Sequence, residues 1–342
     1  MADLKRILIV GPAWIGDMVM AQSLFKVLRE QYPQVAIDVL APAWSAPILK
    51  RMPEVRRHIE IPLAHGEFGL GVRYRLGKQL RAEGYDQAIV IPRSWKAALV
   101  PFFARIPQRT GYKGEMRYGL LNDIRPLDKS VLSQTVQRYV ALGLLANAES
   151  PPAYPTPELR VNSQSARNTI NEFNLSLGAP ILALCPGAEY GPAKCWPPEY
   201  FASVARTKLA EGWQVWVLGS AKERVLAEKM THMAPGCVNL VGKTTLDQAI
   251  DILSQAGVIL SNDSGLMHVA AALKRSLVAI YGSSDPAYTP PLSEKVQIEY
   301  LALDCSPCFA RTCQYGHYRC LKDIKPEQVL KTIADDIVCS EN

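Results

Sequence analysis

The segment SNDSGLMHVAAAL (261–273) places an acidic residue, a hydroxyl, a glycine and a histidine where an apolar run meets a helix-like run. Residues 264–266 would supply the first free N–H groups of that helix, and such groups bind anions. Gly265 has no side chain, so a phosphate could approach the backbone there. Asp263 could cap the helix or orient a sugar hydroxyl, and His268 could reach a phosphate or pack in the core. An anion site and a simply capped helix both stay open.

A second candidate is the carboxylate in GPAWIGDM (11–18), which follows the first apolar run of the chain. The glycine spacing resembles a phosphate loop, but Asp17 stands where that motif has its lysine and would repel a phosphate. The dinucleotide fingerprint G-x-G-x-x-G is also missing, which argues against a nicotinamide enzyme. Asp17 is therefore either a helix cap or a general base directed at a ligand.

Two further loops after apolar runs carry groups that suit a nucleotide ligand. The loop in 185–201 contains Lys194, whose charge could neutralise a leaving phosphate, although most lysines are only solvated. LGSAKE (218–223) offers Ser220 for a close approach and Glu223 for ribose hydroxyls. No loop is specific by itself. Together they predict a nucleotide diphosphate bound by the second half of the chain, with a base supplied by the first half.

The helices and strands that position these loops belong to a protein of 342 residues. Of these residues 48% are hydrophobic and 20% are charged. This length favours two domains, and the composition is typical of a soluble globular protein. No segment approaches the ~20 apolar residues that span a bilayer. The short apolar run near the N-terminus predicts a buried strand rather than a signal peptide, so we expect a cytoplasmic protein. The net charge of +6 allows an anionic partner, but no nucleic-acid motif is present.

Strand-like and helix-like runs alternate along the chain, which indicates βαβ units and a parallel sheet. The alternation is interrupted by ESPPAYPTPE (149–158), whose four prolines predict an interdomain linker. We therefore expect an α/β protein whose two parallel-sheet domains face each other across a cleft, where ligands bind in such folds. The predicted domains are 1–150, 151–325 and a C-terminal helix, 326–342, that packs back toward the first domain.

Four of the eight cysteines lie close together in the sequence as C-x2-C-x4-C-x6-C. Cys305, Cys308, Cys313 and Cys320 resemble a structural zinc or iron–sulfur site in number and proximity. Reduced free thiols and disulfides formed on purification are the alternatives, because a cytosolic chain rarely uses a disulfide framework.

Four segments taken together resemble the heptosyltransferases of glycosyltransferase family 9, which build the core of lipopolysaccharide. They are GPAWIGDMVMAQSL, RTGYKGEMRYGLLND (109–123), PGAEYGPAKCWP (186–197) and SNDSGLMHVAAAL. The resemblance covers essentially the whole chain. The D-[ST]-G-x-x-H element marks the family, and the two middle segments are typical of the branch that adds the second heptose. The resemblance implies a GT-B fold, with two Rossmann-like domains and the nucleotide sugar held by the C-terminal one.

The resemblance also implies a role for each matching residue. Asp17 takes the place of the catalytic base, which deprotonates a hydroxyl of the first heptose. The reaction implied is inverting transfer of L-glycero-D-manno-heptose from ADP-heptose to heptosyl-Kdo2-lipid A. No D-x-D motif occurs in the chain, so we expect neither a catalytic metal nor a cofactor. The implied donor-binding residues are Gly187, Lys194, Ser220, Glu223, Thr244, Thr245, Asp263, Ser264, Gly265, Leu266 and His268.

Positive charges in the first half could steer an anionic glycolipid acceptor and favour the inner face of the cytoplasmic membrane. Ordinary solvation of these side chains is the alternative, and a tryptophan among them could stack on a sugar or belong to the core. These residues are Arg93, Trp95, Lys96, Arg105, Arg109, Lys113 and Arg117.

Other functions remain open at this stage. One is a heptosyltransferase that transfers to Kdo instead of to the first heptose. Another is a GT-B-like nucleotide-sugar epimerase, which would convert the donor without a lipid acceptor. A non-enzymatic protein that binds nucleotide sugars at a membrane surface is the last.

Overall fold

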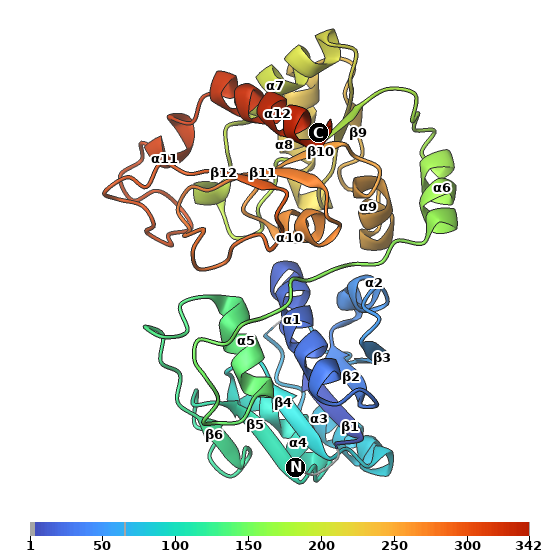
Figure 1. Ribbon diagram of the computed structural model, residues 1–342, viewed down its shortest axis with the longest axis vertical. Helices are drawn as coiled ribbons and strands as arrows, with labels where there is room; N and C mark the ends of the chain where they lie inside the picture. Colours follow the sequence, from blue (N-terminus) through green and yellow to red (C-terminus); the bar gives the residue numbers. More distant parts are fainter. Residues whose placement is uncertain (1–3, 65, 342) are drawn as a thin grey trace. The chain divides into compact units, whose positions relative to one another are not determined.

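The computed structural model describes residues 4–64 and 66–341, the last six of them by their backbone alone. The described chain divides into two compact units, the first ending at Glu158 and the second beginning at Leu159. Each unit contains its own sheet and helices (Figure 1). The predicted boundary, after residue 150, falls inside the first unit.

The first unit is built on a six-stranded sheet in the order β3-β2-β1-β4-β5-β6, and all its strand pairs are parallel. Its central strand reads RILIV, and Ile7, Leu8 and Ile9 are fully buried, as a parallel sheet covered on both faces requires. The strands are β1 (Arg6–Val10), β2 (Ala36–Ala41), β3 (Val55–Glu60), β4 (Gln87–Val90), β5 (Gln108–Tyr112) and β6 (Asp123–Arg125). The helices are α1 (Ile15–Gln31), α2 (Ala46–Leu49), α3 (Leu70–Leu80), α4 (Leu99–Phe103) and α5 (Thr135–Gly143).

The second unit repeats this plan with the order β12-β11-β10-β7-β8-β9, again with parallel pairs throughout. Numbered within each unit, both sheets have the strand order 3-2-1-4-5-6 of dinucleotide-binding folds. The predicted fold class, α/β with two Rossmann-like parallel sheets, is confirmed. The strands are β7 (Ile181–Cys185), β8 (Gln214–Val217), β9 (Val238–Asn239), β10 (Val258–Asn262), β11 (Ser276–Ile280) and β12 (Val296–Glu299). The helices are α6 (Ser163–Glu172), α7 (Pro198–Ala210), α8 (Arg224–Met233), α9 (Leu246–Leu253), α10 (Gly265–Ala272), α11 (Arg319–Lys322) and α12 (Pro326–Glu341).

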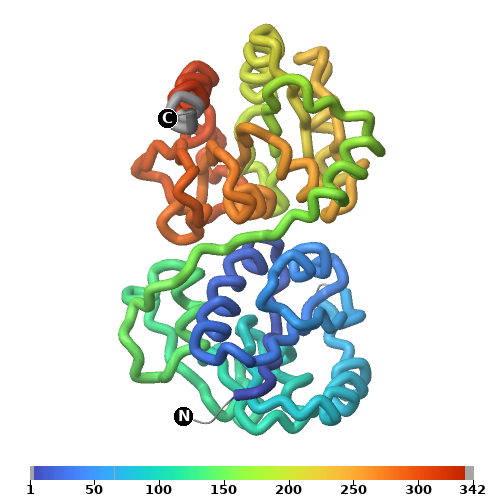
Figure 2. The backbone as a smooth tube through the Cα atoms, turned by 45° about the vertical axis from the view of Figure 1, so that its right-hand side comes forward, coloured from blue at the N-terminus to red at the C-terminus, as the bar shows by residue number. Residues whose placement is uncertain are grey.

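The proline-rich segment 149–158, which the sequence predicts to be a linker, is bound along α1. The side chain of Gln22 donates to the carbonyl of Glu158 and accepts from its N–H, both at 2.8 Å. The Ser23 hydroxyl donates to the carbonyl of Pro155 at 2.7 Å. Gln22 and Ser23 are fully buried, so this extended stretch, green in Figure 2, covers the helix instead of forming a free tether.

The C-terminal helix, α12, has its described contacts within the second unit. It packs on α7, β11 and β12 of its own unit. Val329 and Ile333 are fully buried in one core cluster with Trp196 and Ile324. The helix therefore completes the core of the second unit, and this burial of apolar surface is the reason it lies there.

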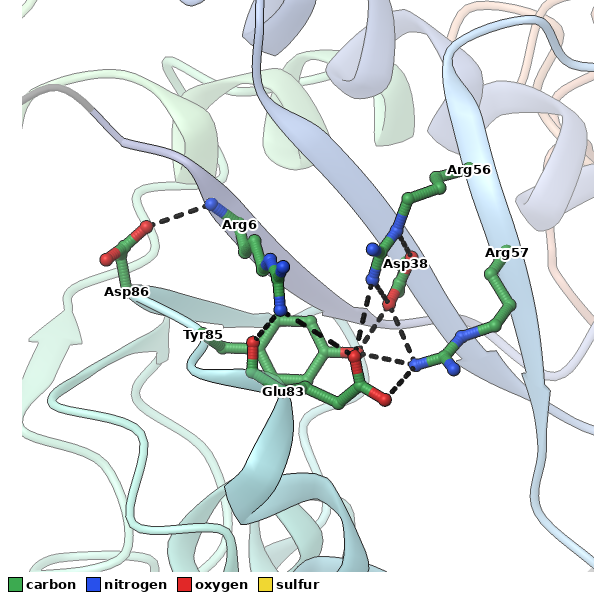
Figure 3. Close-up of polar contacts among 7 residues, drawn as sticks. All are labelled: Arg6, Asp38, Arg56, Arg57, Glu83, Tyr85 and Asp86. Carbon is green, nitrogen blue, oxygen red and sulfur yellow. Dashed lines mark hydrogen bonds and ion pairs between the residues drawn. The ribbon is translucent and has the colours of Figure 1, made fainter.

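A buried carboxylate joins three strands at the amino-terminal end of the first sheet (Figure 3). Asp38 on β2 is fully buried and accepts hydrogen bonds from Arg56 on β3, with one at 2.8 Å, and from Tyr85, just before β4. Arg57 bridges Asp38 and Glu83, at 3.2 and 3.1 Å. Burial alone would raise the pKa of Asp38, but the hydrogen bonds and positive charges lower it below its usual value. The cluster holds this edge together, away from the loops at the carboxyl ends of the strands.

Candidate active site

Asp17 is the third residue of α1, in the loop-to-helix joint that follows β1. The N-cap of this helix is Trp14, so Asp17 is not the helix cap that its position alone allowed. Its Oδ1 accepts a hydrogen bond from the Tyr139 hydroxyl on α5 at 3.0 Å. Because α5 packs along α1, this bond fixes the direction of a half-buried carboxylate at the carboxyl-terminal edge of the first sheet. Such a fixed carboxylate suits a general base.

The structure joins two predicted donor-site residues in an ion pair. Asp263 follows β10, is 5% exposed, and accepts from both Lys194 Nζ and the Ser284 hydroxyl. The Lys194 ammonium also lies 5.0 Å from the centre of the Tyr190 ring, within the range of a cation–π contact. The lysine is thus held in one position between a buried carboxylate and the Tyr190 ring.

The helix expected to bind an anion begins where the sequence predicts. Ser264 is the N-cap of α10 and its side chain makes no capping bond, so residues 264–266 present their N–H groups without a side-chain acceptor from the cap. Asp263, the alternative cap, is instead used by Lys194. The first turn of α10 therefore combines a positive helix end with a nearby ammonium, which is the arrangement that binds phosphate.

His268 lies in the first turn of the same helix and is 5% exposed. Burial lowers the pKa of its imidazole to about 4; the charge of Asp263 opposes this shift and that of Lys194 adds to it. At neutral pH the ring is therefore uncharged. It can contribute a hydrogen bond to a ligand but no positive charge.

The neutral state of His268 predicts a pH-dependent stability. Its folded pKa, about 4, lies below the ordinary value of 6.5, so the unfolded chain binds one more proton between these pH values. The stabilisation is fully present above pH 6.5 and is lost as the pH falls toward 4, by up to ~1.4 kcal/mol per pH unit. Between pH 7 and pH 5, we expect the free energy of unfolding to fall less in the His268→Gln variant than in the unsubstituted protein. Urea denaturation midpoints at both pH values measure this, and equal losses in the two proteins would contradict it.

In the loop after β8, two of the predicted donor-binding residues bind each other. The Glu223 carboxylate accepts from the N–H of Ser220, the N-cap of the short helix that follows. Glu223 also lies directly against the backbone of Gly187 and of Gly219, where a Cβ would collide with its carboxylate. A side chain at position 187 would therefore displace the Glu223 carboxylate, which is held at the carboxyl end of β8 where a ribose contact was predicted.

Thr245, which is predicted to line a nucleotide pocket, is the N-cap of α9. Its hydroxyl accepts from the N–H of Gln248 at 3.2 Å, and its own N–H donates to the Gln248 side chain at 2.9 Å. This pair caps α9, so the hydroxyl already has a structural role. Thr244, immediately before the cap, is half-buried and keeps its predicted role as a proposal.

Two of the predicted acceptor residues are structural. Arg117 is 1% exposed and donates to the carbonyls of Pro92 (2.7 Å) and Tyr112, so it holds a loop against the end of the sheet. Burial, with a smaller contribution from nearby Arg93, lowers its pKa to about 10. Arg109 lies near the amino-terminal end of β5 and donates to the Leu120 carbonyl at 2.7 Å. The Arg117 guanidinium is thus buried against main-chain carbonyls, and two nitrogens of the half-buried Arg109 are bonded to such carbonyls as well.

The other predicted acceptor residues gather after β4 and β5. Arg93 donates to the carbonyl of Lys113 at 3.3 Å, which links the two loops. Trp95 is 40% exposed and its ring centre lies 4.9 Å from that of Phe68. Lys96 donates to the carbonyl of Gly66 at 2.9 Å. Exposed cationic and aromatic groups therefore do occur together at this edge of the first sheet. Arg105, in contrast, lies between α4 and the amino-terminal end of β5.

The four clustered cysteines are free thiols. In the parts of the chain that the structure describes, no three His, Cys, Asp or Glu side chains are placed to hold a metal ion, which departs from the metal-site interpretation of these cysteines. Cys320 is buried, and burial, together with the neighbouring cysteines, raises its pKa to about 11.

The segment that carries these cysteines supports the Lys194 loop instead. The N–H of Ala193 donates to the Arg311 carbonyl at 3.0 Å, and the Tyr190 hydroxyl donates to the Phe309 carbonyl. The Arg311 guanidinium lies 5.3 Å from the centre of the Tyr190 ring. Tyr190, Ser284 and Arg311 are contacts of the candidate site that the sequence does not predict. Ser284 and Arg311 lie in loops that no motif marks, and Tyr190, although it lies within PGAEYGPAKCWP, meets Arg311 only in the fold.

Comparison with known proteins gives matches over most of the chain. Residues 73–319 match the family model described as glycosyltransferase family 9 (heptosyltransferase). The chain is 47% identical to lipopolysaccharide heptosyltransferase 2 of Escherichia coli (strain K12), over 96% of this chain and 97% of the relative. It is 46% identical to lipooligosaccharide heptosyltransferase 2 of Haemophilus influenzae, over 96% and 98%. The solved structure of the E. coli ADP-heptose LPS heptosyltransferase II matches with a TM-score of 0.89 and 43% identity, over 98% of this chain and all of that one.

Proposed function

This chain belongs to glycosyltransferase family 9, and from that premise we propose that it transfers heptose from ADP-heptose to the inner core of lipopolysaccharide. The acceptor is the first core heptose on Kdo2-lipid A, so the product carries the second heptose. The observation that carries the proposal is the near full-length similarity to relatives named heptosyltransferase 2. The second unit binds the donor and the first unit binds the acceptor.

The reaction that we propose is a single displacement with inversion at the anomeric carbon. Asp17 takes the proton from the attacking hydroxyl of the acceptor heptose. The acceptor oxygen forms a bond to C1 of the donor heptose as the bond from C1 to the phosphate oxygen breaks. The electron pair leaves with ADP. The proton on Asp17 then passes to solvent, which restores the carboxylate for the next turnover.

The groups around α10 are suited to the charge that develops on ADP. The N–H groups of residues 264–266 lie at the positive helix end, and Lys194 is held close to them through Asp263. Donors fixed before the reaction stabilise a leaving anion without reorganisation. Asp263 and the neutral His268 can still accept or donate hydrogen bonds to the sugar or phosphate. No step in this scheme requires a metal ion or a cofactor.

The place of action follows from the acceptor. Lipid A is a membrane lipid, so we propose that the protein works at the cytoplasmic face of the inner membrane as a peripheral protein. Among the helices that the structure describes, none is long and apolar enough to cross a bilayer. Association would therefore depend on the surface of the protein.

Release of ADP from ADP-heptose, measured in EDTA with and without an acceptor, tests the function. We expect release that depends on mono-heptosylated Kdo2-lipid A. Release only with unheptosylated Kdo2-lipid A would reassign the protein to the first transfer. Conversion of the donor without any acceptor would favour an epimerase, and a requirement for a divalent metal would overturn the metal-free scheme.

A further inference from the structure

The first unit carries a group of exposed apolar side chains on α3 and around α4. We call the surface formed by these five residues the aromatic face: Phe68, Leu70, Tyr74, Trp95 and Phe102. Each is between 40% and 47% exposed. Single exposed apolar residues are normal on soluble proteins, but a group of large ones on two adjoining helices indicates a binding surface.

The aromatic face is a built surface, because ring contacts and close helix packing hold it. The ring centres of Tyr74 and Phe103 lie 5.2 Å apart, and those of Phe102 and Phe103 lie 5.6 Å apart. Helix α3 approaches α4 closely at Gly77, where a Cβ would lie only 2.5 Å from the Phe103 Cβ. The buried Arg73 donates to the Phe68 carbonyl at 2.7 Å and ties the preceding loop to the helix.

Helix α3 carries only basic charges beside the aromatic face, whereas the exposed Glu67 precedes Phe68 and the Glu115 carboxylate accepts from the Trp95 N–H at 3.0 Å. Residues 68–82 contain four basic residues and no acidic one. Three of the four, Arg75, Lys78 and Arg81, are exposed, and the Lys78 ammonium lies 5.8 Å from the centre of the Tyr74 ring. Aromatic rings flanked by flexible cations are typical of surfaces that enter the headgroup region of an anionic membrane.

We infer that the aromatic face docks the protein on an anionic lipid bilayer. The apolar side chains insert among the headgroups, while Arg75, Lys78 and Arg81 contact lipid phosphates. The inference rests on the proposed function, since a lipid-anchored acceptor requires the protein to work at a membrane. Charge complementarity favours this occupant, because the patch combines apolar area with cations but offers no acidic group along α3 for a basic protein partner.

Co-sedimentation of the full chain with lipid vesicles tests the inference. The vesicles contain phosphatidylethanolamine with phosphatidylglycerol, or phosphatidylcholine alone as the neutral comparison. One variant, Arg75→Gln with Lys78→Gln, removes charge, and another, Leu70→Ser with Phe102→Ser, removes apolar area. The matched control is Arg224→Gln, Val225→Ser and Lys229→Gln, which changes exposed residues of the same kinds on α8.

We expect binding to anionic vesicles that weakens with salt and is absent with phosphatidylcholine. The charge variant should bind roughly 30-fold more weakly, and the apolar variant should also lose binding, whereas the α8 control should bind like the unsubstituted protein. Vesicle binding that is equal in all four proteins would overturn the inference. So would self-association of the unsubstituted chain in solution that both face variants abolish, since the face would then bind a second copy.

Transfer to a deacylated, water-soluble acceptor separates this inference from the proposed function. The face variants should transfer heptose to that acceptor at the normal rate, since the substituted residues lie outside the candidate active site. Normal transfer without vesicle binding by the unsubstituted protein would overturn the aromatic face alone. Vesicle binding through the face without transfer to any acceptor would support the surface and overturn the function.

Discussion

Asp17→Asn is expected to lower the rate of heptose transfer by about 10²–10⁴-fold while leaving the affinity for ADP unchanged. Asparagine has nearly the same shape and can still accept the hydrogen bond that Tyr139 donates to Oδ1 at 3.0 Å. It cannot take a proton from the acceptor hydroxyl, so the loss should lie in kcat. Initial rates of ADP release and calorimetric titration with ADP measure the two quantities.

Tyr139→Phe is the matched control for this substitution. It removes the hydrogen bond that directs the carboxylate but keeps the base, so we expect a loss of less than about tenfold. The thermal midpoints of both variants show whether the fold is intact. Transfer at the normal rate by Asp17→Asn would refute the role of Asp17 as the base and would leave the carboxylate only a place in the first turn of α1.

Lys194→Met is expected to affect both activity and stability. Loss of the ammonium removes a fixed donor to the leaving pyrophosphate, which costs on the order of 10²–10³-fold in kcat/KM. It also leaves Asp263, 5% exposed, without its ion-pair partner. An unpaired buried carboxylate destabilises a fold by about 3–5 kcal/mol. Transfer kinetics and urea denaturation separate the two effects.

A second substitution distinguishes the catalytic contribution from the structural one. Adding Asp263→Asn to Lys194→Met removes the unpaired charge, so stability should recover while transfer stays low. Lys222→Gln is the control for charge alone, because Lys222 is an exposed lysine nearby that pairs with Glu189. Its transfer rate should match that of the unsubstituted protein. Recovery of transfer in the double variant would show that Lys194 acts only by neutralising Asp263.

The central strands were predictable because each is a short apolar run with a turn after it. Five strands have no such apolar run, and they lie at sheet edges (β3, β6, β9 and β12) or next to one (β5). Edge strands carry polar residues, as in VRRHIE of β3, so no apolar run marks them. Each of them pairs with the strand that precedes it in the chain, and its place in the fold depends on that pairing.

The candidate site was predictable where a residue follows directly from a strand-to-helix joint. Asp17, Asp263 and the start of α10 are of this kind. The sequence could not show that Arg117 is buried and bonded to main-chain carbonyls. An arginine that binds carbonyls and one that binds a ligand look the same in a sequence. The pairing of Lys194 with Asp263 was hidden for a related reason, since the two residues come from loops far apart in the chain.

The joint between Glu158 and Leu159 has a consequence for the descent of such enzymes. The units before and after that peptide bond each contain a complete sheet and their own core. A gene recombination at this point would therefore transfer a whole unit. If the first half chooses the acceptor and the second the sugar, one crossover exchanges an entire acceptor preference while the donor chemistry is inherited unchanged. Exchange of whole units would change the surface sugars of a bacterial lineage in fewer steps than point mutations in several separate loops.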